Sequence, residues 1–449
     1  MSSRPLRVAV VGSGPAGFYA AEALLKSEDP QVEVDVLDRL PTPWGLVRLG
    51  VAPDHENIKA VSRAFERTAS RPGFRFFGNV EVGSTVAHDE LAAIYDAVVY
   101  TVGAQTDRRL GIPGEDLPGS WPATAFVAWY NGHPEFQDLR FDLSTERAVV
   151  IGNGNVAIDC ARMLSLTSEE LSPTDTVDAA AEAIAASPIR EILMLGRRGP
   201  VQAAFTPPEL KELGELAGAE PVVDARELEL DPASAHALEL DRERARRNYE
   251  LLQEFAARAP GGKPRRIVLR FLVSPVAIVG EEKVEAVEVV RNELVDEGGR
   301  LVARPTGERE RIPCGLVLRS VGYQGVALPG VPFDERTCTI PNDRGRADRC
   351  ERTYVAGWIK RGPSGVIGTN KKDAAETVEL LLEDARAGRL EAPEPRDLAD
   401  LLRAKGAEFV DHAGWQAIDA AERAAGEPLS RPRVKVTSWE TLLETARSR

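Results

Sequence analysis

Residues 148–161 read AVVIGNGNVAIDCA and contain the central folding signal of this 449-residue chain. Four apolar residues run directly into Gly152-Asn-Gly154-Asn, and a helical apolar pattern follows the turn. A strand, a glycine-rich turn and a helix in that order present backbone N–H groups and a helix N-terminus to a pyrophosphate. The stretch therefore predicts a dinucleotide-binding βαβ unit.

A second fingerprint of the same kind lies near the N-terminus, where residues 8–17 read VAVVGSGPAG. Its glycines are Gly12, Gly14 and Gly17, and a predicted strand at residues 32–37 ends at Asp38. An acidic residue at that place can accept hydrogen bonds from a ribose. The two fingerprints are too far apart for one mononucleotide unit, so we expect two dinucleotide sites and a domain that is interrupted and resumed.

The two predicted sites differ in charge. Asp38 ends the second strand of the first site, whereas Arg197 and Arg198 follow the corresponding strand of the second site. A carboxylate suits a free ribose 2′-hydroxyl, and a pair of guanidinium groups suits a 2′-phosphate. This contrast assigns FAD to the first site and NADP(H) to the second. The alternative for the arginine pair is an ordinary solvated turn.

Composition narrows the class of protein further. A length of 449 residues predicts two or three domains, and a net charge of −14 argues against nucleic acid as a partner. The four cysteines show neither a C-x-x-C pair nor metal-like spacing, which favours a reducing compartment. No apolar run approaches a membrane span, and the N-terminal apolar run leads into a glycine fingerprint as a strand would. We expect a cytoplasmic protein without a metal site.

Two further segments carry functional signals. Residues 40–59 are expected to form a long loop, and they include one of only five histidines, His55. Residues 239–257 have a helical pattern that is rich in arginine, which reverses the sign of an otherwise acidic chain. This stretch is either a docking face for an acidic partner or a solvated helix face, and the sequence favours neither. The arginines concerned are Arg242, Arg244, Arg246 and Arg247.

Several longer motifs are more specific than any glycine pattern. With them the chain resembles the adrenodoxin-reductase-type ferredoxin–NADP reductases, and the bacterial members in particular, from about residue 7 to residue 436. The motifs are GSGPAG, PTPWGLVRLGVAPDH, DRRLGIPGEDLPG, VIGNGNVAIDCAR, GRRGPVQAAFTPPELKEL and AGWIKRGPSGVIGTNKKDA.

The resemblance implies an α/β fold with two Rossmann-like dinucleotide-binding domains, as in glutathione-reductase-like two-domain flavoproteins. It implies a discontinuous FAD domain at residues 1–105 and 331–449 around an NADP domain at residues 106–330. FAD contacts are expected at Gly12, Gly14, Ala16, Gly17, Asp38, Gly45, Leu46, Val82, Trp358, Gly365, Val366 and Ile367. NADP contacts are expected at Arg108, Asn153, Gly154, Asn155, Val156, Arg197, Arg198, Glu209 and Gly365.

The activity implied is that of a ferredoxin–NADP reductase, which transfers a hydride from NADPH to FAD and then single electrons to a ferredoxin. A proton must be handled in that sequence, and His55 is the candidate because imidazole titrates near neutral pH. The resemblance places Asp159 and Glu209 in the same polar cluster. A histidine with a purely structural role remains the alternative.

Other functions fit parts of the pattern. A disulfide reductase shares the two-nucleotide layout but needs a redox-active cysteine pair, which the sequence lacks. A flavin monooxygenase and a non-catalytic NADPH-sensing FAD protein both remain open. The sequence leaves the ferredoxin and its cluster type, the physiological direction, the pathway and the oligomeric state undetermined.

Overall fold

The computed structural model describes residues 4–241, 243–259, 261–390 and 396–448. The chain forms two compact units, each with its own core, and we describe them separately. The first unit combines residues 1–106 with residues 322–449, and the second is formed by residues 107–321. The chain thus returns to the first unit at residue 322, whereas the division drawn from the sequence places this crossing at residue 331.

The first unit is built on a sheet whose described strands run in the order β16-β17-β18-β4-β1-β2-β3. The part from β18 to β3 is parallel, and β16 and β17 pair antiparallel at one edge. The strands are β1 (Leu6–Val11), β2 (Val32–Leu37), β3 (Phe74–Phe77), β4 (Ala97–Tyr100), β16 (Asn342–Asp343), β17 (Arg346–Ala347) and β18 (Thr353–Val355).

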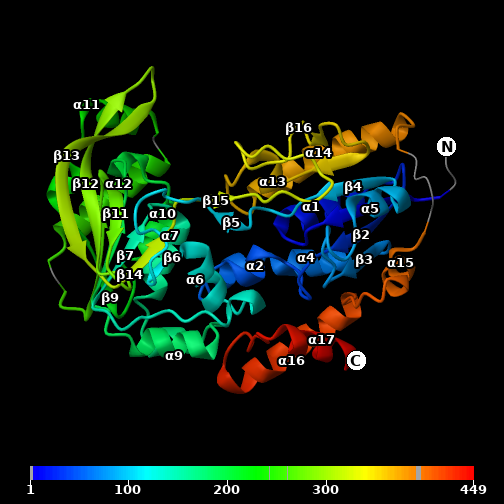
Figure 1. Ribbon diagram of the computed structural model, residues 1–449, viewed down its shortest axis with the longest axis horizontal. Coiled ribbons are helices and arrows are strands. Elements are labelled where there is room, and N and C mark those ends of the chain that lie inside the picture. Colours follow the sequence, from blue (N-terminus) through cyan, green and yellow to red (C-terminus); the bar gives the residue numbers. More distant parts are fainter. Residues whose placement is uncertain (1–3, 242, 260, 391–395, 449) are drawn as a thin grey trace. The chain divides into compact units, whose positions relative to one another are not determined.

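Alternating side chains of these strands enter two cores, one on each face of the sheet. Val8, Val10 and Val36 pack with residues of α1, α14 and α16, and Figure 1 shows α1 and α14 beside this sheet. Ala9 and Val11 pack on the other face with α5 and α15. Both faces are covered, as a parallel sheet requires. The helices are α1 (Pro15–Leu24), α2 (Leu46–Leu49), α3 (Glu56–Lys59), α4 (Ser62–Ala69), α5 (His88–Ile94), α13 (Trp358–Arg361), α14 (Thr369–Arg386), α15 (Leu398–Ala404), α16 (His412–Gly426) and α17 (Trp439–Arg447).

The second unit contains a parallel sheet whose described strands run in the order β6-β14-β7-β8-β10-β9. Its strands are β6 (Ser120–Pro122), β7 (Arg147–Ile151), β8 (Glu191–Leu195), β9 (Ala219–Val223), β10 (Arg265–Arg270) and β14 (Leu316–Arg319). One face packs on helices, and the other packs on an antiparallel sheet of β11 (Val273–Val279), β12 (Ala286–Asp296) and β13 (Leu301–Pro313). The helices are α6 (Ala123–Tyr130), α7 (Asn155–Met163), α8 (Ser168–Leu171), α9 (Asp178–Ala186), α10 (Pro207–Glu212), α11 (Pro232–Leu240) and α12 (Arg244–Ala257).

A two-stranded ladder of β5 (Thr106–Asp107) and β15 (Tyr323–Gln324) occurs where the chain changes unit. Four short 3-10 helices complete the described elements: η1 (Pro134–Phe136), η2 (Pro200–Gln202), η3 (Ala225–Leu228) and η4 (Glu427–Leu429). In each of the two large sheets, a strand is followed by a glycine turn and a helix, which confirms the expected α/β fold with two Rossmann-like units.

Three sequence-based expectations need correction. Residues 40–59 are not a continuous loop, because α2 and α3 each form one helical turn within them. Residues 239–257 are not one helix: α11 ends at Leu240, and α12 begins at Arg244. Helix α17 occupies residues 439–447, where no helix was predicted from the sequence. A helix of four residues is too short to show an apolar periodicity, so the sequence does not reveal α2 or α3. A break of a few residues does not disturb the periodicity on either side of it, so the sequence does not reveal the gap between α11 and α12.

Candidate functional site

The first glycine turn joins β1 to α1 and is shaped by close backbone contacts. A Cβ at Gly12 would lie 2.7 Å from the Thr101 carbonyl oxygen, and one at Gly17 would lie 1.9 Å from the Gly12 carbonyl oxygen. At Gly14, by contrast, a Cβ would meet nothing within 4 Å. Gly14 also caps α1 without any side-chain hydrogen bond. The turn is therefore closed toward the protein and open where a phosphate would approach.

Asp38 lies beside this turn. Its carboxylate accepts hydrogen bonds from the side chain and backbone N–H of Ser13, the latter at 2.9 Å, and from the Leu40 N–H at 2.9 Å. Burial raises the pKa of Asp38 above its ordinary value, although these donors act in the opposite direction. Asp38 thus fixes the glycine turn, and its Oδ1 atom, which accepts only the Leu40 N–H among the described residues, has acceptor capacity left for a ribose hydroxyl.

A second turn, at residues 44–49, packs against the glycine turn. The Trp44 N–H donates to the Ser13 carbonyl oxygen at 3.0 Å, and a Cβ at Gly45 would lie 3.1 Å from the Gly14 Cα atom. Trp44 and Gly45 have positive φ angles of 83° and 50°, conformations that a bulky residue rarely adopts. Leu46, which begins α2, has 39% of its surface exposed.

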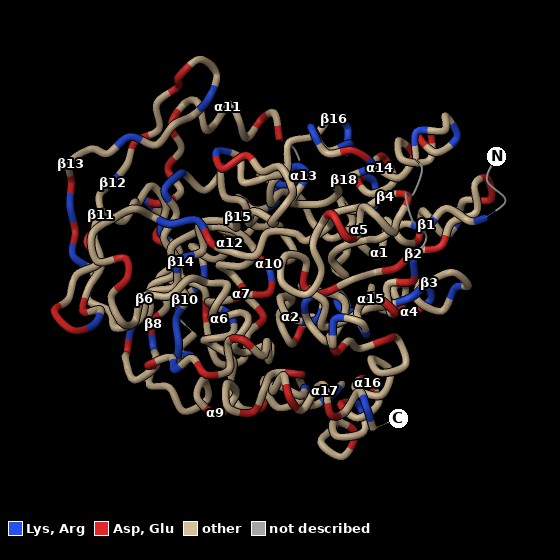
Figure 2. The backbone as a smooth tube through the Cα atoms, turned by 45° about the vertical axis from the view of Figure 1, so that its right-hand side comes forward, with Lys and Arg blue, Asp and Glu red and all other residues tan. Residues whose placement is uncertain are grey.

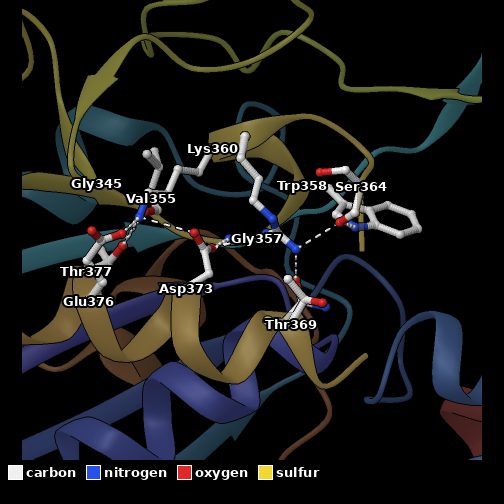
Figure 3. Close-up of polar contacts among 12 residues, drawn as sticks. Gly345, Val355, Gly357, Trp358, Lys360, Ser364, Thr369, Asp373, Glu376 and Thr377 are labelled. Atoms are coloured by element: carbon white, nitrogen blue, oxygen red, sulfur yellow. Dashed lines mark hydrogen bonds and ion pairs between the residues drawn. The ribbon is translucent and has the colours of Figure 1, made fainter. Parts of the chain in front are cut away.

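The turn after β18 reaches the start of α1. Together with the first glycine turn and the 44–49 turn, it forms what we call the first cradle. A Cβ at Gly357, which has a φ of 80°, would lie 2.6 Å from the Cβ of Ala16. The Gly357 N–H donates to the Asp373 carboxylate on α14, and Asp373 also pairs with Lys360 and Arg361, each at 3.2 Å. Figure 3 shows these contacts joining the turn to the helix. This network fixes the turn from which Trp358 begins α13.

Trp358 is oriented by the loop that follows. Its indole N–H donates to the Ser364 carbonyl oxygen at 3.2 Å, as Figure 3 shows, and its ring lies 5.3 Å from that of Tyr323. Further along the loop, Gly365 has a φ of 81° and the Val366 N–H donates to the Thr369 hydroxyl at 3.2 Å. Val366 has 58% of its surface exposed. Val82, also expected in this site, is buried beside β3 and β4 in the core.

These observations fit FAD as a ligand of the first unit. Gly14 and Gly103, the latter after β4, both leave space for a ligand atom where a Cβ would meet nothing within 4 Å. Leu46 and Val366 are apolar side chains left exposed near the turns just described. Open glycine backbone suits a pyrophosphate, and exposed apolar side chains suit a flat aromatic ring.

The second glycine turn joins β7 to α7 in the same manner. Gly152 has a φ of 141°, and a Cβ there would lie 2.1 Å from the Ser320 carbonyl oxygen. A Cβ at Gly154 would again meet nothing within 4 Å, and α7 has no side-chain cap. The turn is tied to the next segment because the Thr206 N–H donates to the Asn155 side-chain oxygen at 2.8 Å. The Asn153 carbonyl oxygen accepts two further N–H groups of that segment. Val156 packs beside the core.

The arginine pair after β8 forms part of a larger positive cluster. Arg197 and Arg198 are exposed, and their carbonyl oxygens accept hydrogen bonds from Asn292 at 2.9 Å and Leu272 at 3.0 Å. Although Arg198 is exposed, partial desolvation of its guanidinium lowers its pKa, and the charges of Arg197, Arg300 and Arg244 act in the same direction. Mutual repulsion of this kind favours binding of a polyanion such as a 2′-phosphate. Sequence reasoning missed Arg300 because it follows a hairpin turn more than a hundred residues away.

The remaining expected residues divide between the units. His55 precedes α3 in the first unit. In the second unit, Asp159 on α7 accepts a hydrogen bond from Arg162 at 3.0 Å, Glu209 lies in the first turn of α10, and Arg108 is exposed. Arg244, Arg246 and Arg247 are exposed on α12, where Arg247 pairs with Glu250 at 3.2 Å. Arg242 lies outside the described residues.

The cysteines offer no dithiol. All four are free, and burial raises the pKa of Cys314 to about 12 and that of Cys160 well above its ordinary value. A thiol of that kind stays protonated and unreactive at neutral pH.

This fold, with one cradle at the first glycine turn and a second at the glycine turn after β7, defines the class of two-unit pyridine-nucleotide flavoproteins. In agreement, a family model described as pyridine nucleotide-disulphide oxidoreductase matches residues 6–194. The chain belongs to the NADPH–ferredoxin reductase family, which includes NADPH:adrenodoxin oxidoreductase.

Three comparisons support this membership. NADPH-ferredoxin reductase FprA of Mycobacterium tuberculosis is 52% identical over 454 residues, spanning 98% of this chain and 99% of the relative. The mitochondrial NADPH:adrenodoxin oxidoreductase of Salvelinus fontinalis is 40% identical over 458 residues, spanning 98% of this chain and 91% of the relative. The solved structure of Mycobacterium tuberculosis FprA in complex with NADPH is 50% identical, with a TM-score of 0.95, and the match covers 99% of this chain and 100% of that one.

Among the described residues, no helix combines the length and apolar character needed to cross a membrane.

Proposed function

We propose that this chain is an NADPH–ferredoxin reductase in which the first unit holds FAD and the second binds NADPH. The observation that carries this assignment is the difference in charge between the two cradles. The first ends in the single carboxylate of Asp38, whereas the second ends in Arg197 and Arg198, with Arg244 and Arg300 as further positive neighbours. Only the second is suited to the additional phosphate of NADPH.

The residues proposed to hold FAD lie on five segments of the first unit. The glycine turn and the 44–49 turn would receive the pyrophosphate, and Asp38 a ribose. The segment after β18 would face the ring system, near Trp358. When bound, FAD accepts a hydride and releases electrons one at a time, and the protein supplies position and electrostatics. The full set is Gly12, Gly14, Ala16, Gly17, Asp38, Gly45, Leu46, Val82, Trp358, Gly365, Val366 and Ile367.

The residues proposed to bind NADPH surround the second glycine turn. Open space at Gly154 and the uncapped N-terminus of α7 support a pyrophosphate there. The arginine cluster would receive the 2′-phosphate, and we add Arg244 and Arg300 to this set on the basis of their influence on Arg198. The other proposed contacts in the second unit are Arg108, Asn153, Asn155, Val156 and Glu209.

A proton must be exchanged with the solvent during turnover, and we propose His55 of the first unit for this role. Asp159 and Glu209 stay proposed polar residues of the second unit. An imidazole changes its charge near neutral pH, which suits it to this task. Asp159 accepts a hydrogen bond from Arg162 at 3.0 Å.

The partner is an iron–sulfur protein of the ferredoxin or adrenodoxin type, and the exposed arginines of α12 are the proposed docking residues. Arg246 suits this role best, because Arg247 is paired with Glu250 and Arg244 belongs to the positive cluster at Arg198. Lys and Arg residues are otherwise interspersed with acidic ones over both units, as Figure 2 shows. A cytoplasmic location stays a prediction, supported by the four free cysteines.

The decisive experiment uses the purified full chain. We expect a yellow protein whose flavin absorbance bleaches anaerobically with NADPH, and cytochrome c reduction that depends on added ferredoxin. A colourless protein would contradict the assignment of FAD. Bleaching without ferredoxin-dependent reduction, together with substrate-stimulated oxygen uptake, would favour a monooxygenase. A flavoprotein that NADPH does not reduce would favour a sensing role.

A further inference from the structure

The C-terminal segment contributes a buried ion cluster to the first unit. The carboxylate of Glu422 on α16 accepts two hydrogen bonds from the Arg48 guanidinium, one of them at 2.8 Å. The side chains of Arg48 and Glu422 are 3% and 0% exposed, although 374 residues separate them in sequence. A bidentate pair this deeply buried has a fixed geometry, because neither partner can exchange the other for water.

Glu422 is also bound by the chain that follows its own helix. After α16 the chain reverses, and the Val434 N–H donates to the Glu422 carbonyl oxygen at 2.9 Å. The Val436 N–H donates to the Glu422 carboxylate at 2.9 Å, and Arg433 pairs with the same carboxylate at 3.0 Å. Arg433 is in turn held by Asp419 at 2.7 Å. Backbone and side-chain donors of the C-terminal segment therefore hold the Glu422 carboxylate in place independently of Arg48.

Burial by itself would raise the pKa of Glu422. The two guanidinium groups and the Val436 N–H outweigh this effect, and the pKa of Glu422 lies below its ordinary value. Glu422 is therefore ionised at neutral pH, as its pairing with Arg48 requires.

Arg48 belongs to the 44–49 turn, which lies against the first glycine turn. The Arg48 N–H donates to the Gly45 carbonyl oxygen at 3.1 Å, and Gly45 is the residue that packs on Gly14. The guanidinium of Arg48 lies 5.3 Å from the ring centre of Trp415, and the ring centres of Trp415 and Trp44 lie 4.8 Å apart with their planes at 80°. One contact at α16 is thus connected to the cofactor cradle through a single turn.

This turn needs external support. Helix α2 is four residues long, which is too short to be stable alone, and the two residues before it have positive φ angles. The positive φ of Trp44, which a bulky residue rarely adopts, persists only where surrounding contacts over-determine it. Trp415 and Glu422 on α16 provide such contacts.

We propose that Glu422 is a positioning residue for FAD, holding the 44–49 turn against the glycine cradle through Arg48. This inference rests on the assignment of FAD to the first unit. The C-terminal segment is then part of the FAD site although it reaches the cofactor only through Arg48 and the turn.

The test compares two full-chain variants. Glu422→Gln keeps the size of the side chain and removes its charge, whereas Arg447→Gln removes an exposed pair with Glu408 in the same segment and serves as the matched control. FAD dissociation constants are measured by titrating each apoprotein, and visible flavin spectra are recorded for each holoenzyme. We expect Glu422→Gln to weaken FAD binding by about tenfold and to shift the flavin absorption bands, and Arg447→Gln to match the parent.

Thermal unfolding of the apoproteins separates positioning from a merely structural role. A folded Glu422→Gln variant with the parental dissociation constant and spectrum overturns the inference, whatever its melting temperature. Equal loss of FAD from the Arg447→Gln control overturns it too. If Glu422→Gln fails to fold, the test uses Arg48→Lys, which keeps the positive charge but cannot form the bidentate contact with Glu422. An unchanged FAD affinity of Arg48→Lys overturns the inference. A parent chain that binds no FAD would instead contradict the proposed function.

Discussion

Asp373 of α14 accepts the backbone N–H of Gly357, and the same carboxylate pairs with Lys360 and Arg361. One acidic side chain therefore fixes both the turn before Trp358 and the two basic residues of the short helix that follows. Gly357 in turn approaches Ala16 at the start of α1, so the C-terminal part of the first unit shapes the N-terminal cradle.

Replacing Asp373 tests this connection. We expect Asp373→Asn to weaken FAD binding by about fivefold. Lys360 and Arg361 lose the negative charge that they pair with, and the Gly357 N–H then donates to a neutral amide oxygen instead of a carboxylate. The measurement is a titration of apoprotein with FAD. Glu376→Gln is the control, since Glu376 pairs only with Lys360 at 2.9 Å among these groups and is half exposed. Equal weakening in both variants would contradict a specific role for Asp373.

The arginine cluster is expected to decide nucleotide preference. Arg198→Gln should raise the KM for NADPH by roughly 10- to 100-fold, because charge-assisted bonds to the 2′-phosphate are lost, and leave the KM for NADH unchanged. Arg300→Gln should have the same direction with a smaller effect. Steady-state reduction of ferricyanide with both nucleotides gives the numbers. A parallel rise for NADH would show that the cluster does not recognise the 2′-phosphate.

His55 is expected to set the pH dependence of turnover. His55→Gln should flatten the dependence of NADPH-driven reduction near neutral pH, because glutamine cannot take up or release a proton there. Stopped-flow reduction and ferredoxin-dependent cytochrome c reduction are followed across pH. Rates and pH profiles identical to those of the parent would remove His55 from the mechanism.

Docking of the iron–sulfur partner is expected to depend on Arg246. Arg246→Glu should raise the KM for ferredoxin by about fivefold and leave ferricyanide reduction unchanged, since a small anion needs no docking face. Arg311→Glu, an exposed arginine on β13 in the same unit, controls for the change in net charge. If both variants weaken ferredoxin equally, the effect is one of overall charge.

Acid stability should depend on Asp384. Burial opposes its ionisation, but hydrogen bonds from Arg346, Tyr354 and Arg389 prevail and lower the pKa of Asp384 to about 2. A carboxyl with a depressed folded-state pKa stabilises the fold above its unfolded-state pKa of about 4, and that contribution is lost as the pH falls toward 2.

The stabilisation amounts to about 2 kcal/mol at neutral pH. Asp384→Asn should therefore reduce the free energy of unfolding at pH 7 and lessen its fall between pH 4 and 2. Denaturant unfolding of the holoprotein at each pH gives this difference. A variant with the parental pH dependence would contradict the assignment.

Prediction from the sequence succeeded where the signal is local. The strand at residues 32–37 was expected with the bounds of β2, and strands were expected before the two glycine turns, where β1 and β7 lie as apolar runs that end at glycine. It failed at α2 and α3, which are single turns stabilised by their surroundings, and at α17, whose partners lie on α16. Asp38 was expected from its position, but its bonds to Ser13 and Leu40 appear only in the folded chain.

The sequence by itself determined the two cradles and their difference in charge, because a strand, a glycine turn and a helix are encoded by neighbouring residues. Only the tertiary structure decided how distant segments complete each site. Arg300, which lies in the turn between β12 and β13, adds its positive charge near Arg198. Glu422 pairs with Arg48, which lies 374 residues away in the sequence. Such pairs form only when whole helices and strands pack together. No local sequence pattern indicates them, because the two charged residues lie far apart in the chain.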